Sequence, residues 1–325
     1  MRIGVDLGGT NLRVAAFGDD PARPLAELRE PVGEPRDPDA IVDRVARAIE
    51  DISGGAEATV GVGIAAMLRD RVGTVASSPH LRWRDVPFGR LLARRLGAGH
   101  AGNGTRHRLG VYNDASAIVW GESVAGAARG CRDVLGVYVG TGIGAGVIAN
   151  GALVEGTSAC AGEIGHVKVR WDDAAAPCAC GQLGCVEAYV GGAYVQRRIL
   201  EELARGARSS ALALAGGLAH VHAGHVDAAA GEGDAWALAL WTELAPLLAV
   251  ALAGALAVLN PERLVLGGGL LARCPTLYQL VVTALEVAAP AASLEPLSIA
   301  LAELGDVAGP CGAAHLAASG VSIVS

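Results

Sequence analysis

The sequence predicts an α/β fold, because short apolar strands alternate with helical segments along the whole chain of 325 residues. One arrangement also occurs twice: a strand, a glycine-rich turn and a second strand form residues 2–17 and again residues 133–154. A chain of this length can bury two hydrophobic cores. We therefore expect two lobes that share a duplicated hairpin with a glycine corner.

The first lobe is expected at residues 1–117, joined by a C-terminal helix at about 306–325 that returns to it. A helix is predicted at 37–52, where apolar residues have helical spacing after an aspartate cap. A second helix is predicted at 87–97, where a glycine ends it. The expected strands are apolar runs bounded by turn residues, at 2–7, 12–17, 58–68 and 108–114.

The second lobe is expected at residues 118–305. Its most apolar run, 244–259, is shorter than the roughly 18 residues that a membrane span needs. Pro246 interrupts this run, so we expect a helix buried on most sides. The other predicted elements are helices at 115–126, 187–206 and 233–261, strands within 133–154, and a strand that opens 263–271.

Composition and charge narrow the class of protein. Apolar residues make up 52% of the chain and charged residues 18%, as in folded proteins. The formal net charge of −7 argues against broad nucleic-acid binding. The start of the sequence lacks the basic and apolar regions of a signal peptide. We expect a cytoplasmic protein with reduced thiols, because four of the seven cysteines are scattered: Cys131, Cys160, Cys274 and Cys311.

Three glycine-rich turns each follow an apolar strand, at residues 6–11, 140–146 and 266–269. Glycines allow a close approach of the backbone, and successive N–H groups form a concave anion site. A hairpin corner explains one such turn, but three favour a bound polyphosphate. None is a P-loop, and no helix clearly follows 140–146 as a dinucleotide fingerprint requires. Asp6 directly precedes the first turn, and an acidic residue near bound phosphates can hold Mg²⁺, directly or through water.

The tripeptide Tyr-Asn-Asp at 112–114 ends a predicted strand, where α/β sheets place groups that contact ligands. Asp114 can accept the proton of a hydroxyl that attacks a phosphoryl group, and Asn113 can orient that hydroxyl. In the alternative interpretation, the residues form an Asx turn and Asp114 caps the next helix. Taken alone, this tripeptide favours the cap.

At these residues the chain resembles the ROK family of sugar kinases, of the actin-like ATPase superfamily. The most specific resemblance is the pattern C-x-C-G-x-x-G-C-x-E with E-x-G-H upstream of it. The similarity extends over nearly the full length and is carried by the motifs DLGGTN, NDASA, GTGIGAG, GEIGHVKV, CACGQLGCVEAY, GDAWALAL, LNPERLVLGGGL and GPCGAAHLA.

The resemblance implies an actin-like fold, with two RNase H-like lobes and a central cleft for ATP and sugar. Asp114 matches the family's catalytic base. The sugar-binding residues match Asn113, Asp114, Glu163, His166 and Glu187. The metal ligands match His166, Cys178, Cys180 and Cys185. The phosphate and adenosine motifs match Asp6, Gly8, Gly9, Thr10, Asn11, Gly140, Thr141, Gly142, Gly267 and Gly268. A homodimer is also implied.

The cysteine-rich segment at 163–187 favours a metal site on chemical grounds. Three thiolates and an imidazole suit a closed tetrahedral Zn²⁺ site, which leaves no position for water and is therefore structural. A redox pair is the main alternative, but C-x-C is not the C-x-x-C of thioredoxin-like sites. With one nitrogen of His166 on the metal, the other is left for a sugar hydroxyl, and Glu163 and Glu187 flank the ligands.

We expect an ATP-dependent kinase for the 6-hydroxyl of a hexose, with glucose as the substrate, Mg²⁺ bound with ATP, and structural Zn²⁺. Ala65-Ala66 and His80 depart from the Pro-Gly and Asn that the family usually has near the sugar. Fructose, mannose, allose and an N-acylhexosamine therefore remain open as substrates, and polyphosphate as donor.

Two other classes are alternatives. A sugar-sensing transcriptional regulator of the same family carries an N-terminal helix-turn-helix, for which we expect no room before the motif that begins at residue 6. A chaperone-type or scaffold ATPase on this fold has no use for a sugar site ordered by zinc. We expect neither a nucleic-acid nor a membrane partner.

Overall fold

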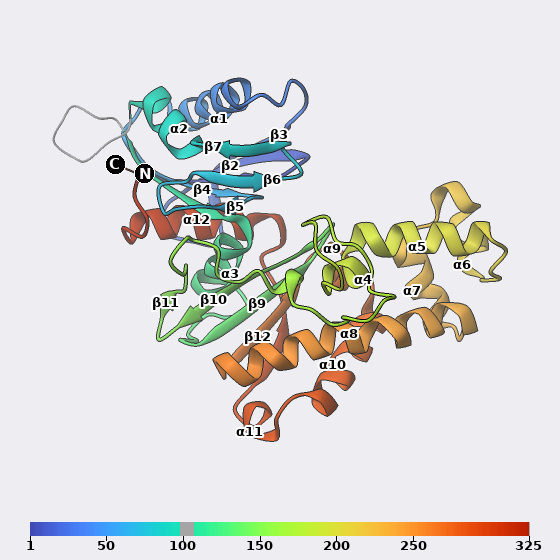
Figure 1. The fold of residues 1–325 in the computed structure, drawn as a ribbon. Helices are drawn as coiled ribbons and strands as arrows, with labels where there is room; N and C mark the ends of the chain where they lie inside the picture. Colours follow the sequence, from blue (N-terminus) through green and yellow to red (C-terminus); the bar gives the residue numbers. More distant parts are fainter. Residues whose placement is uncertain (98–106, 325) are drawn as a thin grey trace. The chain divides into compact units, whose positions relative to one another are not determined.

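The structure is a computed structural model that describes residues 1–97 and 107–324. Two five-stranded sheets with flanking helices confirm the predicted α/β class (Figure 1). The chain divides into two compact units. Unit 1 comprises Met1–Gly136, Gly146–Gly162 and Ala302–Ser325, and unit 2 comprises Val137–Ala145 and Glu163–Leu301.

The first sheet lies in unit 1 and has the strand order β3-β2-β1-β4-β8. β1 runs antiparallel to β2 and parallel to β4, which is parallel to β8. The predicted N-terminal hairpin is therefore confirmed, whereas β3 was not predicted because its charged side chains conceal an exposed edge strand. The strands are β1 (Arg2–Leu7), β2 (Asn11–Phe17), β3 (Pro24–Pro31), β4 (Ala58–Ile64) and β8 (His107–Asn113).

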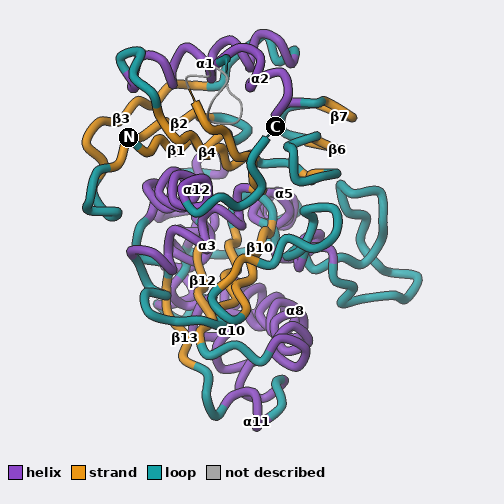
Figure 2. Tube along the Cα trace, turned by 90° about the vertical axis from the view of Figure 1, so that its left-hand side faces the viewer, coloured by secondary structure: helices purple, strands orange, loops and turns teal. Residues whose placement is uncertain are grey.

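Helices cover both faces of this sheet, with α1 and α2 on one face and α3 and α12 on the other (Figure 2). α1 begins at the predicted cap, because the Asp37 side chain accepts a hydrogen bond from the Ala40 N–H at 2.9 Å. It ends at Gly54, which is left-handed. The four helices are α1 (Pro38–Ser53), α2 (Phe88–Leu96), α3 (Asp114–Ala125) and α12 (Ala308–Ala318).

Helix α12 packs on β1 and β4 so closely that two positions require glycine. A Cβ on Gly4 would lie 1.7 Å from the carbonyl oxygen of Pro310, and one on Gly61 would lie 1.8 Å from that of Ala313. No real Cβ tolerates such distances, so the backbone of the helix rests directly on the backbone of the sheet.

A small antiparallel sheet also belongs to unit 1, in the order β5-β6-β7. It was not predicted. The strand expected at 58–68 ends at Ile64. The last two residues of the predicted range, 67–68, belong to β5 instead. These strands are too short to show a hydrophobic period: β5 (Met67–Leu68), β6 (Val75–Ser78) and β7 (Trp83–Val86).

The second sheet has the order β11-β10-β9-β12-β13, and the division between the units runs through β9 and β10. In both sheets a hairpin is followed along the sheet by the two later strands, so the predicted duplication is confirmed at the level of topology. The strands are β9 (Val134–Val139), β10 (Ile143–Ala149), β11 (Ala152–Leu153), β12 (Arg263–Gly267) and β13 (Ser298–Leu301).

Unit 2 is otherwise helical, and its longest helix is α8 (Ala235–Leu259), which continues through Pro246. Of the described helices, only α8 is long and apolar enough to span a membrane, and it packs against α10 instead. The prediction of burial on most sides was partly wrong, because Val250 and Val258 are exposed. The other helices are α4 (Glu187–Val190), α5 (Gly192–Ala204), α6 (Ala211–Ala215), α7 (Ala223–Gly231), α9 (Gly269–Arg273), α10 (Pro275–Ala288) and α11 (Ala291–Leu294).

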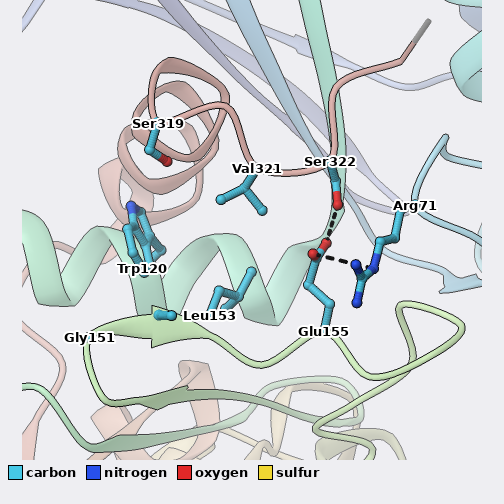
Figure 3. Close-up of a pocket in the computed structure, with 9 residues that line it drawn as sticks. Arg71, Trp120, Gly151, Leu153, Glu155, Ser319, Val321 and Ser322 are labelled. Atoms are coloured by element: carbon cyan, nitrogen blue, oxygen red, sulfur yellow. Dashed lines mark hydrogen bonds and ion pairs between the residues drawn. The ribbon is translucent and has the colours of Figure 1, made fainter.

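An open cavity of about 580 Å³ in unit 1 lies between α3 and the segment that follows α12 (Figure 3). The Ser322 hydroxyl donates to Glu155 at 2.6 Å, and the Arg71 guanidinium lies 3.7 Å from the same carboxylate. Trp120 and Leu153 provide the apolar part of the lining. Because Glu155 is already paired with Ser322 and Arg71, the carboxylate fastens the C-terminal segment to the unit.

Candidate active site and metal centre

Three neighbouring strands of unit 1 end at one edge of the first sheet. β1, β4 and β8 are parallel, and their last residues Leu7, Ile64 and Asn113 are in register. The predicted turn 8–11, the unusual pair Ala65-Ala66 and the candidate base Asp114 directly follow these strand ends. The carboxyl ends of parallel strands are where α/β sheets bind ligands, so this edge is the candidate catalytic part of unit 1.

The first glycine turn is closed by its own backbone. The Gly8 N–H donates to the carbonyl oxygen of Asn11 at 3.0 Å, and the Thr10 carbonyl accepts from the Val32 N–H at 2.8 Å. Gly9 and Thr10 form the tip, where Thr10 is exposed. The Gly8 amide is thus already bonded within the turn, and the tip is the part left to contact a ligand.

Asp6, the predicted magnesium contact, forms an ion pair with Arg13 at 2.8 Å. Arg13 also reaches Asp306 at 2.9 Å, and Asp306 binds Arg29 at 3.1 Å. Burial raises the pKa of Asp6, and the guanidinium of Arg13 opposes this rise only in part. Sequence reasoning missed Arg13, although a signal existed: in the predicted hairpin it stands directly opposite Asp6.

Asn113, not Asp114, caps helix α3. The Asn113 Oδ1 accepts from the Ser116 N–H at 3.2 Å, and its Nδ2 donates to the carbonyl oxygen of Ala66 at 3.2 Å. Asp114 is the first residue of the helix and is half-buried. The alternative in which Asp114 caps the helix was therefore wrong, because the asparagine before it fulfils that role.

The two glycine turns of unit 2 lie against each other. Gly268 has a φ of +85°, and a Cβ there would lie 2.5 Å from the backbone of Val139, next to Gly140. The Gly140 N–H donates to the Gly142 carbonyl at 2.9 Å, and the Gly140 carbonyl accepts from the Gly192 N–H at 2.9 Å. The predicted contacts Thr141 and Gly267 lie in the same two turns. Sequence-distant glycines therefore form one backbone surface in unit 2.

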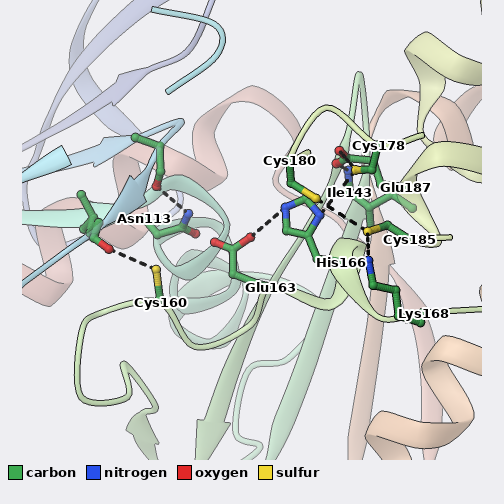
Figure 4. A network of polar contacts seen from close by, with 12 residues as sticks. Asn113, Ile143, Cys160, Glu163, His166, Lys168, Cys178, Cys180, Cys185 and Glu187 are labelled. Carbon is green, nitrogen blue, oxygen red and sulfur yellow. Dashed lines mark hydrogen bonds and ion pairs between the residues drawn. The ribbon is translucent and has the colours of Figure 1, made fainter. Parts of the chain in front are cut away.

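The predicted metal ligands form one cluster in unit 2 (Figure 4). The ligand atoms of His166, Cys178, Cys180 and Cys185 all lie within 4.8 Å of one another. The Sγ atoms of Cys180 and Cys185 are 3.7 Å apart, and Cys178 Sγ lies 3.8 Å from His166 Nδ1. A tetrahedral Zn²⁺ with bonds of about 2.3 Å to sulfur and about 2.0 Å to nitrogen separates such atoms by about 3.5–3.8 Å. The donor set and its spacing therefore fit zinc.

The loop that carries the cysteines is held by two tyrosines. The Tyr189 hydroxyl accepts from the Ala176 N–H at 2.7 Å, and the Tyr194 hydroxyl accepts from the Ala179 N–H at 2.7 Å. Burial raises the pKa of the Cys178 thiol to about 12, so ligation requires the metal to displace its proton. No sequence pattern predicts a role for either tyrosine, because their partners are backbone groups of the loop.

Both predicted carboxylates adjoin this cluster. Glu163 Oε2 lies 3.8 Å from Nε2 of His166, the ring nitrogen that faces away from Cys178. Burial raises the pKa of Glu163, which His166 opposes and Glu187 reinforces. Glu187 accepts from the Ile143 N–H at 2.8 Å, and its other oxygen is 3.8 Å from Cys178 Sγ. Glu187 therefore connects the glycine turn at 140–142 to the cysteine loop.

The predicted site residues thus fall into two groups. Unit 1 contains the first glycine turn with Asn113 and Asp114, and unit 2 contains the other glycine turns, the two glutamates and the metal ligands. The first group offers a carboxylate beside a strand-end turn. The second offers carboxylates and an imidazole that belongs to the candidate metal cluster, a set of groups that suits the recognition of vicinal hydroxyls.

Comparison with known proteins adds independent findings. The model of the ROK family matches residues 2–319. The glucokinase of Thermotoga maritima is 34% identical over 82% of this chain and 81% of its own length. The glucokinase of Streptomyces coelicolor is 31% identical over 98% of this chain and 97% of its own length. A crystal structure of a ROK family glucokinase from Streptomyces griseus, in complex with glucose and AMPPNP, has a TM-score of 0.80 at 29% identity, covering 98% of this chain and 99% of that one.

Proposed function

The chain belongs to the ROK family, and on that premise we propose that it transfers the γ-phosphoryl group of ATP to the 6-hydroxyl of a hexose, with glucose as the preferred acceptor. One observation carries the proposal: the similarity to a glucokinase bound to glucose and an ATP analogue extends over 98% of this chain. The motifs by which the sequence resembles this family also support it.

In this reaction Asp114 acts as the general base. Its carboxylate takes the proton from the sugar hydroxyl as the hydroxyl oxygen attacks the γ-phosphorus, and ADP leaves with the bridging oxygen. Asn113 keeps α3 and the strand end in place through its bonds to Ser116 and Ala66, and it contacts the sugar beside Asp114. Most of the rate enhancement comes from positioning and from charge stabilisation.

The hexose hydroxyls are bound by Glu163, His166 and Glu187. Zinc held by His166 Nδ1, Cys178, Cys180 and Cys185 supplies a structural anchor when it is bound. The ring orientation then leaves Nε2 of His166, beside Glu163, for a sugar hydroxyl. The two carboxylates can each accept hydrogen bonds from neighbouring hydroxyls.

ATP is bound by the glycine turns, and Mg²⁺ accompanies its phosphates. The tip of the first turn, Gly9 and Thr10, contacts phosphate, and the turns of unit 2 contact phosphate and adenosine. Asp6, whose carboxylate pairs with Arg13 at 2.8 Å, would provide an acidic contact for that metal. We further propose a homodimer, a cytoplasmic location in keeping with seven free cysteines, and a lobe boundary near residue 117.

A coupled ADP-release assay tests the function. Glucose, fructose, mannose, allose and N-acetylated hexosamines are compared as acceptors, and ATP is compared with polyphosphate as donor. We expect hexose-dependent ADP release with the highest kcat/KM for glucose and ATP. ADP release that is independent of every sugar would instead indicate an ATPase of another kind.

A further inference from the structure

His80 lies against the tip of the first glycine turn, although the two are 71 positions apart in the chain. It belongs to the turn between β6 and β7. A Cβ on Gly9 would lie 2.6 Å from the Cβ of His80, 3.0 Å from its Cγ and 3.3 Å from its Nδ1. The absence of a side chain at position 9 is therefore what admits the imidazole to this place.

The backbone that carries His80 is fixed from two directions. On one side, the Arg36 guanidinium donates to the His80 carbonyl, and the Arg36 carbonyl accepts from the Trp83 indole N–H at 2.7 Å. On the other side, the Ser78 hydroxyl donates to the Ala65 carbonyl at 2.8 Å. The carbonyl oxygen of the next residue, Ala66, accepts a hydrogen bond from the Asn113 side-chain amide at 3.2 Å. His80 is thus tied to the strand end that carries the candidate base.

The imidazole ring of His80 takes no part in these hydrogen bonds. The His80 side chain is exposed, and among the described residues neither of its nitrogens has a hydrogen-bond partner. A histidine retained for packing alone usually buries its ring, whereas this ring is exposed and its Nδ1 lies beside the Gly9 tip of the turn. An imidazole N–H is a good donor to a phosphate oxygen, in addition to the backbone N–H groups of the turn.

We propose that His80 donates a hydrogen bond to the γ-phosphoryl group of the bound nucleotide at the Gly9–Thr10 tip. The inference rests on the proposed kinase function and extends it with a phosphate contact that the glycine motifs do not contain. His80 neither gains nor loses a proton in the reaction; its N–H stabilises charge on the oxygens of the group in transfer. Asp114 alone receives the proton of the sugar hydroxyl.

Nucleotide affinity tests this contact without depending on turnover. His80→Ala is expected to weaken the binding of AMPPNP, which has a third phosphate, about tenfold or more, and to leave ADP binding nearly unchanged. His80→Asn keeps an N–H donor and is expected to recover most of the AMPPNP affinity. His220→Ala, which removes an exposed histidine of unit 2, is the matched control. Isothermal titration calorimetry with both nucleotides gives the comparison.

Kinetics give a second measurement. In His80→Ala the kcat/KM for ATP should fall about 10- to 100-fold. An equal loss of AMPPNP and ADP affinity would reduce His80 to a packing residue of the turn and overturn the proposal, as would no loss at all. If the wild-type protein phosphorylates no hexose, the proposed function fails, but the two nucleotide affinities still decide whether His80 contacts the third phosphate.

Discussion

The hairpin of β1 and β2 and the hairpin of β9 and β10 have the same layout but different surroundings. In unit 1 the turn closes on itself through Gly8 and Asn11, and its tip is exposed beside His80. In unit 2 the turn at 140–142 is bonded to the start of α5. Ile143, directly after the turn, donates to Glu187, which adjoins the cysteine loop. A duplicated element can therefore stand exposed in one copy and be tied into its surroundings in the other.

The largest effect on turnover should come from Asp114, which follows the carboxyl end of β8 in unit 1. Asp114→Asn removes the base but keeps the shape of the side chain, so kcat should fall about 10²–10⁴-fold while hexose binding is kept. Steady-state kinetics and calorimetry measure the two quantities. Asp39→Asn, on the exposed first turn of α1, is the control. Near-normal turnover in Asp114→Asn would remove Asp114 from the role of base.

Loss of the metal should disable the sugar-binding group of unit 2. Cys185→Ser, or stripping with a chelator, should abolish stoichiometric zinc, lower thermal stability and weaken hexose binding at least about tenfold, because the loop loses its anchor. Cys274→Ser changes an equally buried cysteine outside the cluster and is the control. Metal analysis, thermal melts and hexose titration give the readouts. Unchanged hexose affinity in zinc-free protein would contradict the coupling of metal and sugar sites.

The link between the second turn and the cysteine loop can be broken at one residue. Glu187→Ala removes the acceptor of the Ile143 N–H, which should cost about 1–3 kcal/mol of folding stability. It should also weaken AMPPNP binding, since the turn at 140–142 loses its support. The control is Glu286→Ala, on the exposed side of α10. An affinity for AMPPNP equal to that of wild type would show that the turn keeps its shape without this bond.

The smallest effect concerns Asp6 and depends on pH. Because burial raises the pKa of Asp6 above its ordinary 3.8, the native state binds this proton more tightly than the unfolded state does. The contribution of Asp6 to stability therefore falls as pH rises from about 4 through the raised pKa. Asp6→Asn should raise the melting temperature at pH 7, and the gain should shrink toward pH 4. A gain that is constant with pH would mean that ionisation of Asp6 has no part in it.

The sequence contained the elements that depend on local patterns. The strand–glycine–strand layout predicted both hairpins, and the residue types and spacing around Cys178 and Cys185 predicted a cluster whose geometry fits zinc. The distinction between Asn113 and Asp114 as the helix cap was not available, because both residue types cap helices equally well. In the folded chain, the Ala66 carbonyl accepts a hydrogen bond from the Asn113 side-chain amide and so holds this residue in the capping position.

Other features could not be predicted because they arise from packing between distant segments. Helix α8 is apolar on all sides and has no polar stripe. The sequence therefore shows no periodicity from which the exposure of Val258 could be predicted. The contact between His80 and Gly9 depends on a three-stranded sheet whose strands have two to four residues. Strands of this length are below what a hydrophobic pattern can resolve.

The close seating of α12 on β1 and β4 has a consequence for biosynthesis. Gly4 and Gly61 leave the ribosome well before the backbone that covers them, around Pro310 and Ala313. Until α12 is made, the part of the sheet that it covers on β1 and β4 stays open, although domains generally fold as they are synthesised. Unit 1 can therefore be completed only after α12 has emerged from the ribosome.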